Sequence, residues 1–256
     1  MLVIDFTDSA GSPAGPPSPW AEGGVSVASE HAKAPEPTLA RLSRYLRCLR
    51  QLAEAGVKTV SSKQMEEKLG VLSAQIRKDL SYFGEFGRPG IGYEVQHLLD
   101  RLTEIMQLDR EHRAVIAGAG NLGSALAGYT GFGKSSFRIV GIFDNNFGKI
   151  GRMLWNLEIL DINQMPEMNQ TLGADIGIIA VPAEAAQQAA DVMVQSGIRA
   201  ILNFAPGHIV VPAHVAARNV DFLRELEILS YYFDRLLPPS LAGQAEECAP
   251  EPSEPK

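Results

Sequence analysis

The chain has 256 residues, of which 45% are hydrophobic and 21% charged, and its formal net charge is −7. This length allows one or two buried cores, because typical domains contain about 100 to 200 residues. No stretch approaches the ~18 consecutive apolar residues that a membrane span requires, and the first residues carry Asp5 without the basic flank of a secretory signal. The composition therefore excludes a transmembrane protein, and we expect a cytoplasmic one.

The two cysteines, Cys48 and Cys248, form no CxxC pair. A disulfide framework or a cysteine-based zinc site is therefore not expected. We predict no bound metal.

The charge is distributed unevenly along the chain. Residues 38–95 contain ten Lys or Arg and six Asp or Glu, an excess of four positive charges, so the remainder carries −11. A basic module can attract phosphate while an acidic remainder keeps the chain in solution. The segregation allows a nucleic-acid partner, although a solvated basic surface explains it equally well.

Both ends have the composition of disordered segments. Residues 1–37 are rich in Pro, Gly, Ser and Ala, and residues 238–256 are rich in Pro and Glu. Such segments bury too little apolar surface to offset the entropy of ordering. We expect function to reside between them.

The first ordered part reads as a helix followed by a helix-turn-helix. Thr38 is a plausible N-cap for an amphipathic helix that ends at Gly56. Ser61 and Gln64 have the spacing of a capping box for a second helix, which ends at Gly70. Ser73 can cap a third helix, "SAQIRKDLSYFG". Two short helices joined by a tight glycine-containing turn are typical of DNA-binding helix-turn-helix motifs.

A glycine-rich segment, "GEFGRPGIGYEV", follows the third helix. Pro89 and Gly90 suit positions i+1 and i+2 of a type II turn, so the segment is predicted to form a hairpin or wing with Arg88 at its tip. This order of elements is that of a winged helix.

Residues 97–110 are expected to form a connecting helix, after which the pattern changes. Short apolar runs at 113–117, 137–143, 176–181 and 200–204 alternate with helical stretches at 122–130 and 183–196. Strands spaced by helices predict an α/β fold with a doubly wound parallel sheet. A final helix at 221–237 is apolar over so wide a surface that burial in a dimer is expected.

The sequence "AVIAGAGNLG" matches a dinucleotide-binding fingerprint. It follows the strand-like "RAVIA", opens a helix, and precedes Asp144 by about 20 residues, as in Rossmann folds. We assign Gly118 to the tight turn, Gly120 to close approach of the pyrophosphate, and Gly123 to helix–strand packing. Asp144 would bind the adenosine ribose. Because only Asn145 and Asn146 follow it, no counter-charge for a 2′-phosphate is evident, and NAD is favoured over NADP.

An NAD-dependent oxidoreductase with an N-terminal regulatory module is the alternative interpretation. Such an enzyme needs a proton donor or acceptor and a substrate site. Of the five histidines only His208 falls near the expected cofactor, and it is more simply a loop residue. No second domain remains to hold a substrate, so we do not expect an enzyme.

The third helix offers groups that suit DNA bases. Gln75, Arg77 and Lys78 lie near its start, and Arg or Lys commonly contacts guanine, as Gln contacts adenine. Ile76 and Leu80 are expected to face the core. Taken alone, this helix is more simply explained by a solvated basic face.

The motifs together resemble the Rex family of redox-sensing transcriptional repressors. The resemblance covers residues 38–237 and is carried in order by "TLARLSRYLRCLRQL", "SAQIRKDLSYFGEFGRPGIGYEV", "AGAGNLGSALAGYTGF", "FDNNFGKIG" and "VDFLRELEILSYY". It implies a homodimer that binds double-stranded DNA at a palindromic operator and senses NADH against NAD+. Together with the composition of the two ends, it divides the chain into five expected segments: a disordered arm (1–37), a winged-helix DNA-binding domain (38–96), a Rossmann NAD(H)-binding domain with its connecting helix (97–220), a domain-swapped dimerisation helix (221–237) and a disordered tail (238–256).

The resemblance also implies roles for individual residues. It places Gln75, Arg77 and Lys78 on DNA, with Arg88 and Tyr93 of the wing toward the minor groove. It places Tyr129 by the nicotinamide, Asp221 and Phe222 at the start of the swapped helix, and Arg47 in contact with that aspartate. The nucleotide would contact Gly118, Ala119, Gly120, Asn121, Leu122, Gly123 and Asp144. The family tends to carry an acidic run after this aspartate, whereas this chain has "NNF", which leaves adenosine recognition open.

Overall fold

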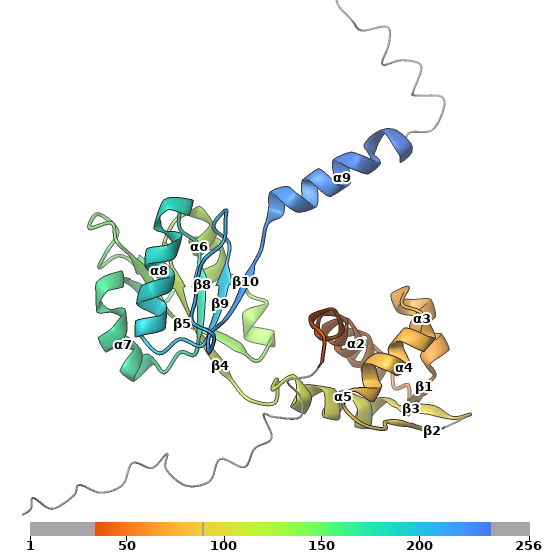
Figure 1. Ribbon diagram of the computed structural model, residues 1–256. Coiled ribbons are helices and arrows are strands. Elements are labelled where there is room, and N and C mark those ends of the chain that lie inside the picture. The colour runs from red at the N-terminus through yellow and green to blue at the C-terminus, as the bar shows by residue number, and fades with distance from the viewer. Residues whose placement is uncertain (1–33, 89, 237–256) are drawn as a thin grey trace, which may run out of the picture. The chain divides into compact units, whose positions relative to one another are not determined.

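The computed structural model describes residues 34–88 and 90–236 (Figure 1). The segments expected to be disordered, 1–37 and 238–256, lie outside these ranges except for residues 34–37, where the first helix begins. The chain divides into two compact units, residues 1–106 and 107–256. Each unit has its own fold.

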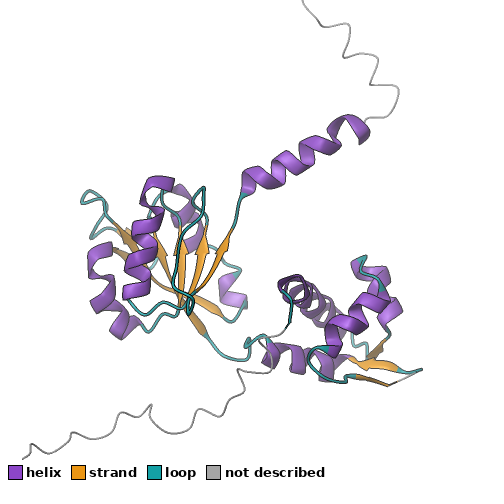
Figure 2. Cartoon of the chain, in the orientation of Figure 1, coloured by secondary structure: helices purple, strands orange, loops and turns teal. Residues whose placement is uncertain are grey.

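The first unit contains helices and a small antiparallel sheet (Figure 2). The helices surround a core that includes Leu42, Leu49, Met65, Ile76 and Leu98, all fully buried. The strands have the order β1-β3-β2. Its elements are α2 (Glu36–Glu54), β1 (Thr59–Val60), α3 (Ser62–Leu69), α4 (Ser73–Ser81), β2 (Gly87–Arg88), β3 (Gly92–Glu94) and α5 (Val95–Ile105).

Local sequence signals explain the helix-turn-helix and the hairpin. The Ser61 hydroxyl accepts from the Gln64 N–H at 3.1 Å, and the Ser61 N–H donates to Gln64 Oε1 at 2.8 Å, which confirms the capping box. Gly70 ends α3 with φ +64°, a conformation that glycine adopts without strain. In the hairpin, the Ile91 N–H donates to the Arg88 carbonyl at 3.1 Å, and Gly90 has φ +80°, the sign required at position i+2 of a type II turn.

Two predicted N-caps were wrong. Helix α2 begins at Glu36, two residues before Thr38, because a proline in its first turn already has a helical φ. The Thr38 hydroxyl does not cap the helix; it is buried and donates to Asp79. Helix α4 has Leu72 at its N-cap position, without a side-chain cap. The Glu66 carboxylate of α3 supplies the missing acceptor, since the Ser73 N–H donates to Glu66 Oε2 at 2.9 Å.

The connecting helix α5 belongs to the first unit, although we expected it beside the nucleotide fold. The boundary lies after Met106. Val95, Leu98 and Leu102 are buried, and α5 packs against α2. The apolar face of α5 therefore completes the core of the first unit.

The second unit is built on a seven-stranded sheet with the order β10-β9-β8-β4-β5-β7-β6. All neighbouring strands are parallel except β6, which pairs antiparallel with β7. The expected strands are present, and β6, β7, β10 and α7 are additional. The elements are β4 (His112–Ala117), α6 (Asn121–Ala127), η1 (Phe132–Lys134), β5 (Phe137–Asp144), β6 (Met153–Leu154), β7 (Leu157–Asp161), η2 (Ile162–Gln164), α7 (Met165–Leu172), β8 (Ile176–Ile179), α8 (Ala183–Gln195), β9 (Ala200–Asn203), β10 (Ala216–Asn219) and α9 (Phe222–Leu236).

Helices cover both faces of this sheet, which confirms the predicted parallel Rossmann-like architecture (Figure 1). Alternate residues of β4 face opposite sides: Val115 joins a cluster with Met165 of α7 and Met193 of α8, whereas Ile116 joins a cluster packed with Leu126 of α6. The strand order reverses direction at β4, the point where such sheets bind ligands. In the part of the chain described here, no helix is long and apolar enough to cross a membrane.

Candidate functional site

The glycine turn after β4 lies at this reversal point. Gly118 has φ +105°, and a Cβ atom there would collide with the Ala180 carbonyl oxygen at the end of β8. A Cβ atom at Gly123 would collide with the Gly118 carbonyl oxygen. Gly120 differs from both, because no atom lies within 4 Å of its Cβ position. Two glycines are therefore required for packing, and Gly120 leaves open space above the backbone.

Asp144, at the end of β5, links this turn to the next loop. Its side chain is 5% exposed. Oδ2 accepts from the Ala119 N–H at 2.8 Å and from Lys149 Nζ at 2.9 Å, and Oδ1 accepts from the Asn146 N–H at 2.8 Å. Burial opposes ionisation, but the hydrogen bonds from Lys149, Asn146 and Ala119 outweigh it, so the pKa of Asp144 is lowered.

The position of Lys149 corrects one sequence inference. The residues directly after Asp144 offer no counter-charge for a 2′-phosphate, yet the Lys149 ammonium is 2.9 Å from the Asp144 carboxylate. A carboxylate has about four lone-pair sites, and three hydrogen bonds leave one on Oδ1 for a sugar hydroxyl. The only sequence signal was a lysine five residues after the aspartate in "FDNNFGKIG", and spacing alone does not fold it back.

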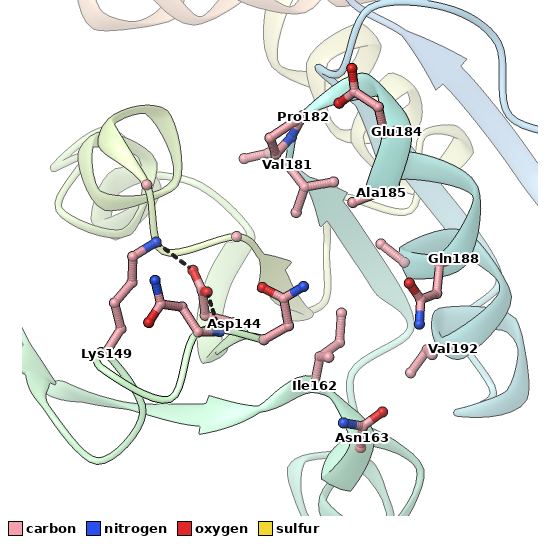
Figure 3. A pocket seen from close by; sticks show the side chains of 16 residues that line it. Asp144, Lys149, Ile162, Asn163, Val181, Pro182, Glu184, Ala185, Gln188 and Val192 are labelled. Carbon is pink, nitrogen blue, oxygen red and sulfur yellow. Dashed lines mark hydrogen bonds and ion pairs between the residues drawn. The ribbon is translucent and has the colours of Figure 1, made fainter.

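A cavity of about 490 Å³ opens beside Gly118, Gly120 and Asp144. Figure 3 shows Lys149 directed toward Asp144 on one side, Ile162 and Asn163 below, and α8 on the opposite side. The first turn of α6 begins at Asn121, directly after the lining residue Gly120, so Asn121 and Leu122 bring helix N–H groups to this edge, and helix N-termini favour phosphate. The α8 side of the lining comprises Pro182, Glu184, Ala185, Gln188, Ala189 and Val192. Apolar walls with a few amides and the carboxylates of Asp144 and Glu184 suit a flat base joined to a sugar and phosphate.

The residues implied for sensing lie elsewhere. Tyr129 follows α6, is 60% exposed, and makes an edge contact with Phe132 at 5.4 Å. It lines a separate hollow rather than the cavity of the glycine turn. Asp221 accepts from the Leu223 and Arg224 N–H groups at the start of α9, and Phe222 stacks on Phe204 at 5.8 Å. Arg47 is exposed on α2 of the first unit.

Helix α4, which the sequence predicts to be the recognition helix, exposes Arg77 and Lys78, whereas Ile76 and Leu80 face the core as expected. Arg77 donates to the Ser62 hydroxyl of α3 at 2.9 Å. Gln75 is only partly exposed, because its amide donates to Asp79. The exposed Arg77 and Lys78 side chains can contact phosphates or bases. The Gln75 side chain is instead held by its hydrogen bond to Asp79.

Asp79 is the centre of a buried network that the sequence reasoning missed. Its side chain is fully buried and accepts five hydrogen bonds. The Arg41 guanidinium binds both carboxylate oxygens, at 2.6 and 2.8 Å, and the Tyr45 hydroxyl donates at 2.7 Å. Thr38 and Gln75 donate to Oδ1 at 3.0 and 2.8 Å. Three of the four donor residues, Thr38, Arg41 and Tyr45, belong to α2, so the network joins the N-terminal half of α2 to α4.

The wing requires a correction for Tyr93. Arg88 is exposed on β2, but Tyr93 of β3 is only 7% exposed. Its ring lies against Gly87, whose Cβ position is 2.8 Å from the Tyr93 ring, and burial raises its pKa. Tyr93 therefore packs inside the hairpin instead of extending from it. Arg77 and Arg88 border one hollow of about 630 Å³ between α4 and the hairpin.

The Asp79 network predicts a specific acid sensitivity. Burial opposes ionisation of Asp79, but the hydrogen bonds from Arg41, Tyr45 and Gln75 lower its pKa from the usual 3.8 to about 2. Since the folded-state pKa is the lower one, the stabilisation is complete above pH ~4 and is lost as the pH falls toward 2, about 2 kcal/mol in all. Urea titrations at pH 6 and pH 3, followed by amide resonances of α2 and α4, should show about half of this loss, because pH 3 lies midway between the two pKa values. An Asp79→Asn variant should lack it, and equal losses in both proteins would contradict the assignment.

No group of three His, Cys, Asp or Glu side chains that could hold a metal ion occurs in residues 34–88 and 90–236.

Comparisons with known proteins assign both units. Residues 33–81 match the family described as "Putative DNA-binding protein N-terminus", and residues 109–207 match the CoA binding domain family. The redox-sensing transcriptional repressor Rex of Pelotomaculum thermopropionicum is 50% identical over 199 residues, which cover 78% of this chain and 93% of the relative. Rex 1 of Thermotoga maritima is 42% identical over 200 residues, 78% of this chain and 95% of the relative.

Solved structures agree with the sequence relatives. The crystal structure of RSP in complex with β-NAD+ and operator DNA has a TM-score of 0.75 at 38% identity, covering 84% of this chain and 98% of that one. The complex of RSP with β-NADH has a TM-score of 0.71 at 39% identity, covering 79% of this chain and 95% of that one. RSP is described as a Rex-family repressor. Identity at this level, over nearly the whole length of the relatives, shows that the chain belongs to the Rex family of redox-sensing transcriptional repressors.

Proposed function

We propose that this protein is a homodimeric repressor that binds a palindromic operator and is released when NADH occupies its Rossmann unit. The observation that carries the proposal is the presence, in one chain, of a helix that exposes basic side chains and a cavity of about 490 Å³ at the glycine turn. The related RSP has been crystallised with operator DNA and NAD+, and with NADH. Membership of a repressor family supports regulation over catalysis.

Nucleotide binding is assigned to the glycine turn and the loop after β5. The pyrophosphate would lie over Gly120, against the N–H groups of Asn121 and Leu122, with Gly118, Ala119 and Gly123 shaping the turn. The ribose would bind Asp144, whose carboxylate disfavours a 2′-phosphate; NAD(H) is thus preferred even with Lys149 nearby.

The switch requires a difference between NAD+ and NADH, which are identical apart from the charge and shape of the nicotinamide. We assign its recognition to Tyr129, together with Arg47 and with Asp221 and Phe222 of the partner subunit. NADH can shift the protein only as far as it binds one arrangement better than the other. A shift from 1:99 to 99:1 requires a differential affinity of about 5.5 kcal/mol.

Operator binding is assigned to Arg77 and Lys78 of α4, with Gln75 beside them and Arg88 at the wing. Replacing Lys78 by alanine should weaken operator binding about tenfold, because a good contact to a base edge contributes about 1–3 kcal/mol. Lys78 is exposed, so the fold and the Kd for NADH should not change. Fluorescence anisotropy with labelled duplex measures the first and calorimetry the second; loss of both affinities would instead indicate misfolding.

Dimerisation is assigned to α9, which we propose is swapped between subunits. Its large apolar side chains are exposed on more than one side: Phe222, Leu223, Leu226, Ile228, Leu229, Tyr231, Tyr232 and Phe233. An unpartnered apolar surface of this kind normally marks an interface. Leu229→Glu should therefore halve the mass measured by light scattering and weaken operator binding at least tenfold. Ser230→Glu adds the same charge at the neighbouring position and should leave the dimer intact; monomers in both variants, or in neither, would refute this assignment.

One binding experiment tests the whole proposal. A duplex is first selected from a randomised library with the full chain, and its Kd is then measured with NADH, with NAD+ and without nucleotide. NADH should release the DNA at a concentration where NAD+ does not. Equal binding in all three conditions, or no selected palindrome, would refute the proposal and favour an oxidoreductase.

A further inference from the structure

Gln75 is the only assigned DNA contact on α4 whose side chain is fixed by a buried group. Its Nε2 lies 2.8 Å from Asp79 Oδ1, and Asp79 is fully buried. Gln75 occupies the first turn of α4, and the first residues of a recognition helix are those that reach base edges. The orientation of this amide therefore decides which base it can recognise.

The chemistry of Asp79 settles which end of the amide faces inward. Its carboxylate receives a bidentate Arg41 and the Tyr45 hydroxyl, and its low pKa, about 2, keeps it ionised at neutral pH. An ionised carboxylate only accepts hydrogen bonds. The Gln75 atom in contact with it must be the NH₂ group, because an amide oxygen at 2.8 Å would face another acceptor. The opposite end, Oε1, has no partner among the hydrogen bonds of the described residues.

We propose that Asp79 is a positioning residue for DNA recognition, which turns the Gln75 amide so that its oxygen meets the bases of the operator. The base read by Gln75 is then one that presents an amino group in the major groove, adenine through N6 or cytosine through N4. Guanine and thymine present only acceptors at the corresponding edge, so Oε1 would receive no hydrogen bond from them, and only the second Nε2 hydrogen could donate to such a base. This inference rests on the proposed function, and it predicts which bases are preferred at one position of the operator.

The remaining members of the network explain why this orientation is stable. Thr38 and the Arg41 Nη2 also bind Oδ1, the oxygen that holds Gln75. Turning the amide over would place Oε1 against this carboxylate and leave one acceptor-to-acceptor contact in a buried site, which is unfavourable. The orientation is therefore determined before DNA binds.

Base analogues provide the test. On the duplex selected with the full chain, each adenine of a half-site is replaced singly by purine, which lacks the 6-amino group, and each cytosine by 2-pyrimidinone, which lacks the 4-amino group. The wild type and Gln75→Ala are measured on every duplex, so that any weakening of the duplex itself cancels between the two proteins. At one position, loss of the amino group should weaken the wild type about fivefold, the effect of one hydrogen bond, and should weaken Gln75→Ala less than twofold.

Asp79→Asn tests the positioning role. Its amide can donate or accept, so Gln75 is free to turn, and the fivefold dependence on the amino group should disappear while the Kd for NADH is unchanged. If this variant does not fold, the side-chain amide protons of Gln75 in the wild type still report the tether, since one of them should exchange slowly with solvent. The inference is overturned if Gln75 acts at a guanine or thymine, if no amino group matters to it, or if Asp79→Asn keeps the full dependence. Failure of the selected duplex to respond to NADH would refute the proposed function alone.

Discussion

Replacing Gly120 by valine is expected to produce a repressor that binds DNA but no longer responds to NADH. The backbone of Gly120 has φ −84° and ψ −166°, which valine adopts readily, and no atom lies within 4 Å of the Cβ position. The new side chain would instead occupy the space assigned to the pyrophosphate. Because inserting extra methyl groups into a packed contact costs about 1–3 kcal/mol, the Kd for NADH should rise about 10- to 100-fold. Calorimetry measures this, and anisotropy should show operator binding unchanged with or without NADH.

Gly123→Ala is the informative companion, because it should behave in the opposite way. Its Cβ would collide with the Gly118 carbonyl oxygen and press on Ile116. The nucleotide unit should then unfold at lower urea concentration, as judged by the amide resonances of β4 and β5. If Gly120→Val destabilises this unit as much as Gly123→Ala does, its effect on NADH binding is structural, and the assignment of the pyrophosphate to Gly120 fails.

Replacing Asp79 by alanine should destabilise the first unit by about 3–5 kcal/mol, the usual cost of removing one partner of a buried ion pair. The Tyr45 hydroxyl would lose its acceptor inside a core where Tyr45 is fully buried, and Arg41 would lose both of its carboxylate contacts. Stabilities of whole domains are about 5–15 kcal/mol, so much of the folding free energy of this unit would be lost. Urea titration followed by amide resonances of α2 and α4 measures the change.

Asp100→Ala is the matched control for this prediction. Asp100 lies in the same unit, on α5, but it is exposed and accepts a single hydrogen bond from Gln96. Its replacement should change stability by less than ~0.5 kcal/mol. The resonances of the nucleotide unit should be unaffected by either substitution. A small effect of Asp79→Ala, similar to that of Asp100→Ala, would contradict the central role of the network.

Features that depend on neighbouring residues could be predicted from the sequence. The capping box of Ser61 and Gln64, the C-cap at Gly70 and the strand–turn–helix around Gly118 each lie within a few residues, and their geometry follows from local chemistry. The parallel sheet followed from apolar runs separated by helical ones. Strand β7, "LEILD", carries two acids, and all four residues of β10 are exposed, so neither shows the apolar run that reveals β4.

Features that join distant residues could not be predicted. Asp79 is separated from Thr38 by 41 residues, and nothing in "RKDLS" indicates that its aspartate is buried while the adjacent basic residues are exposed. The same applies to Glu66 of α3, which accepts a hydrogen bond from the first residue of α4. It also applies to Lys149 beside Asp144 and to Tyr93 inside the hairpin. Sequence patterns gave the residue types of the site, whereas their partners depend on how helices and loops pack.

The hydrogen bond from the Ala119 N–H to Asp144 has a consequence for the energetics of the nucleotide site. It ties the glycine turn after β4 to the end of β5 at 2.8 Å, and Lys149 holds the same carboxylate oxygen. Both hydrogen bonds join protein groups alone, so the chain itself defines the shape of the turn. The entropy cost of arranging this part of the site is met when the chain folds, so little conformational ordering of the turn should oppose binding.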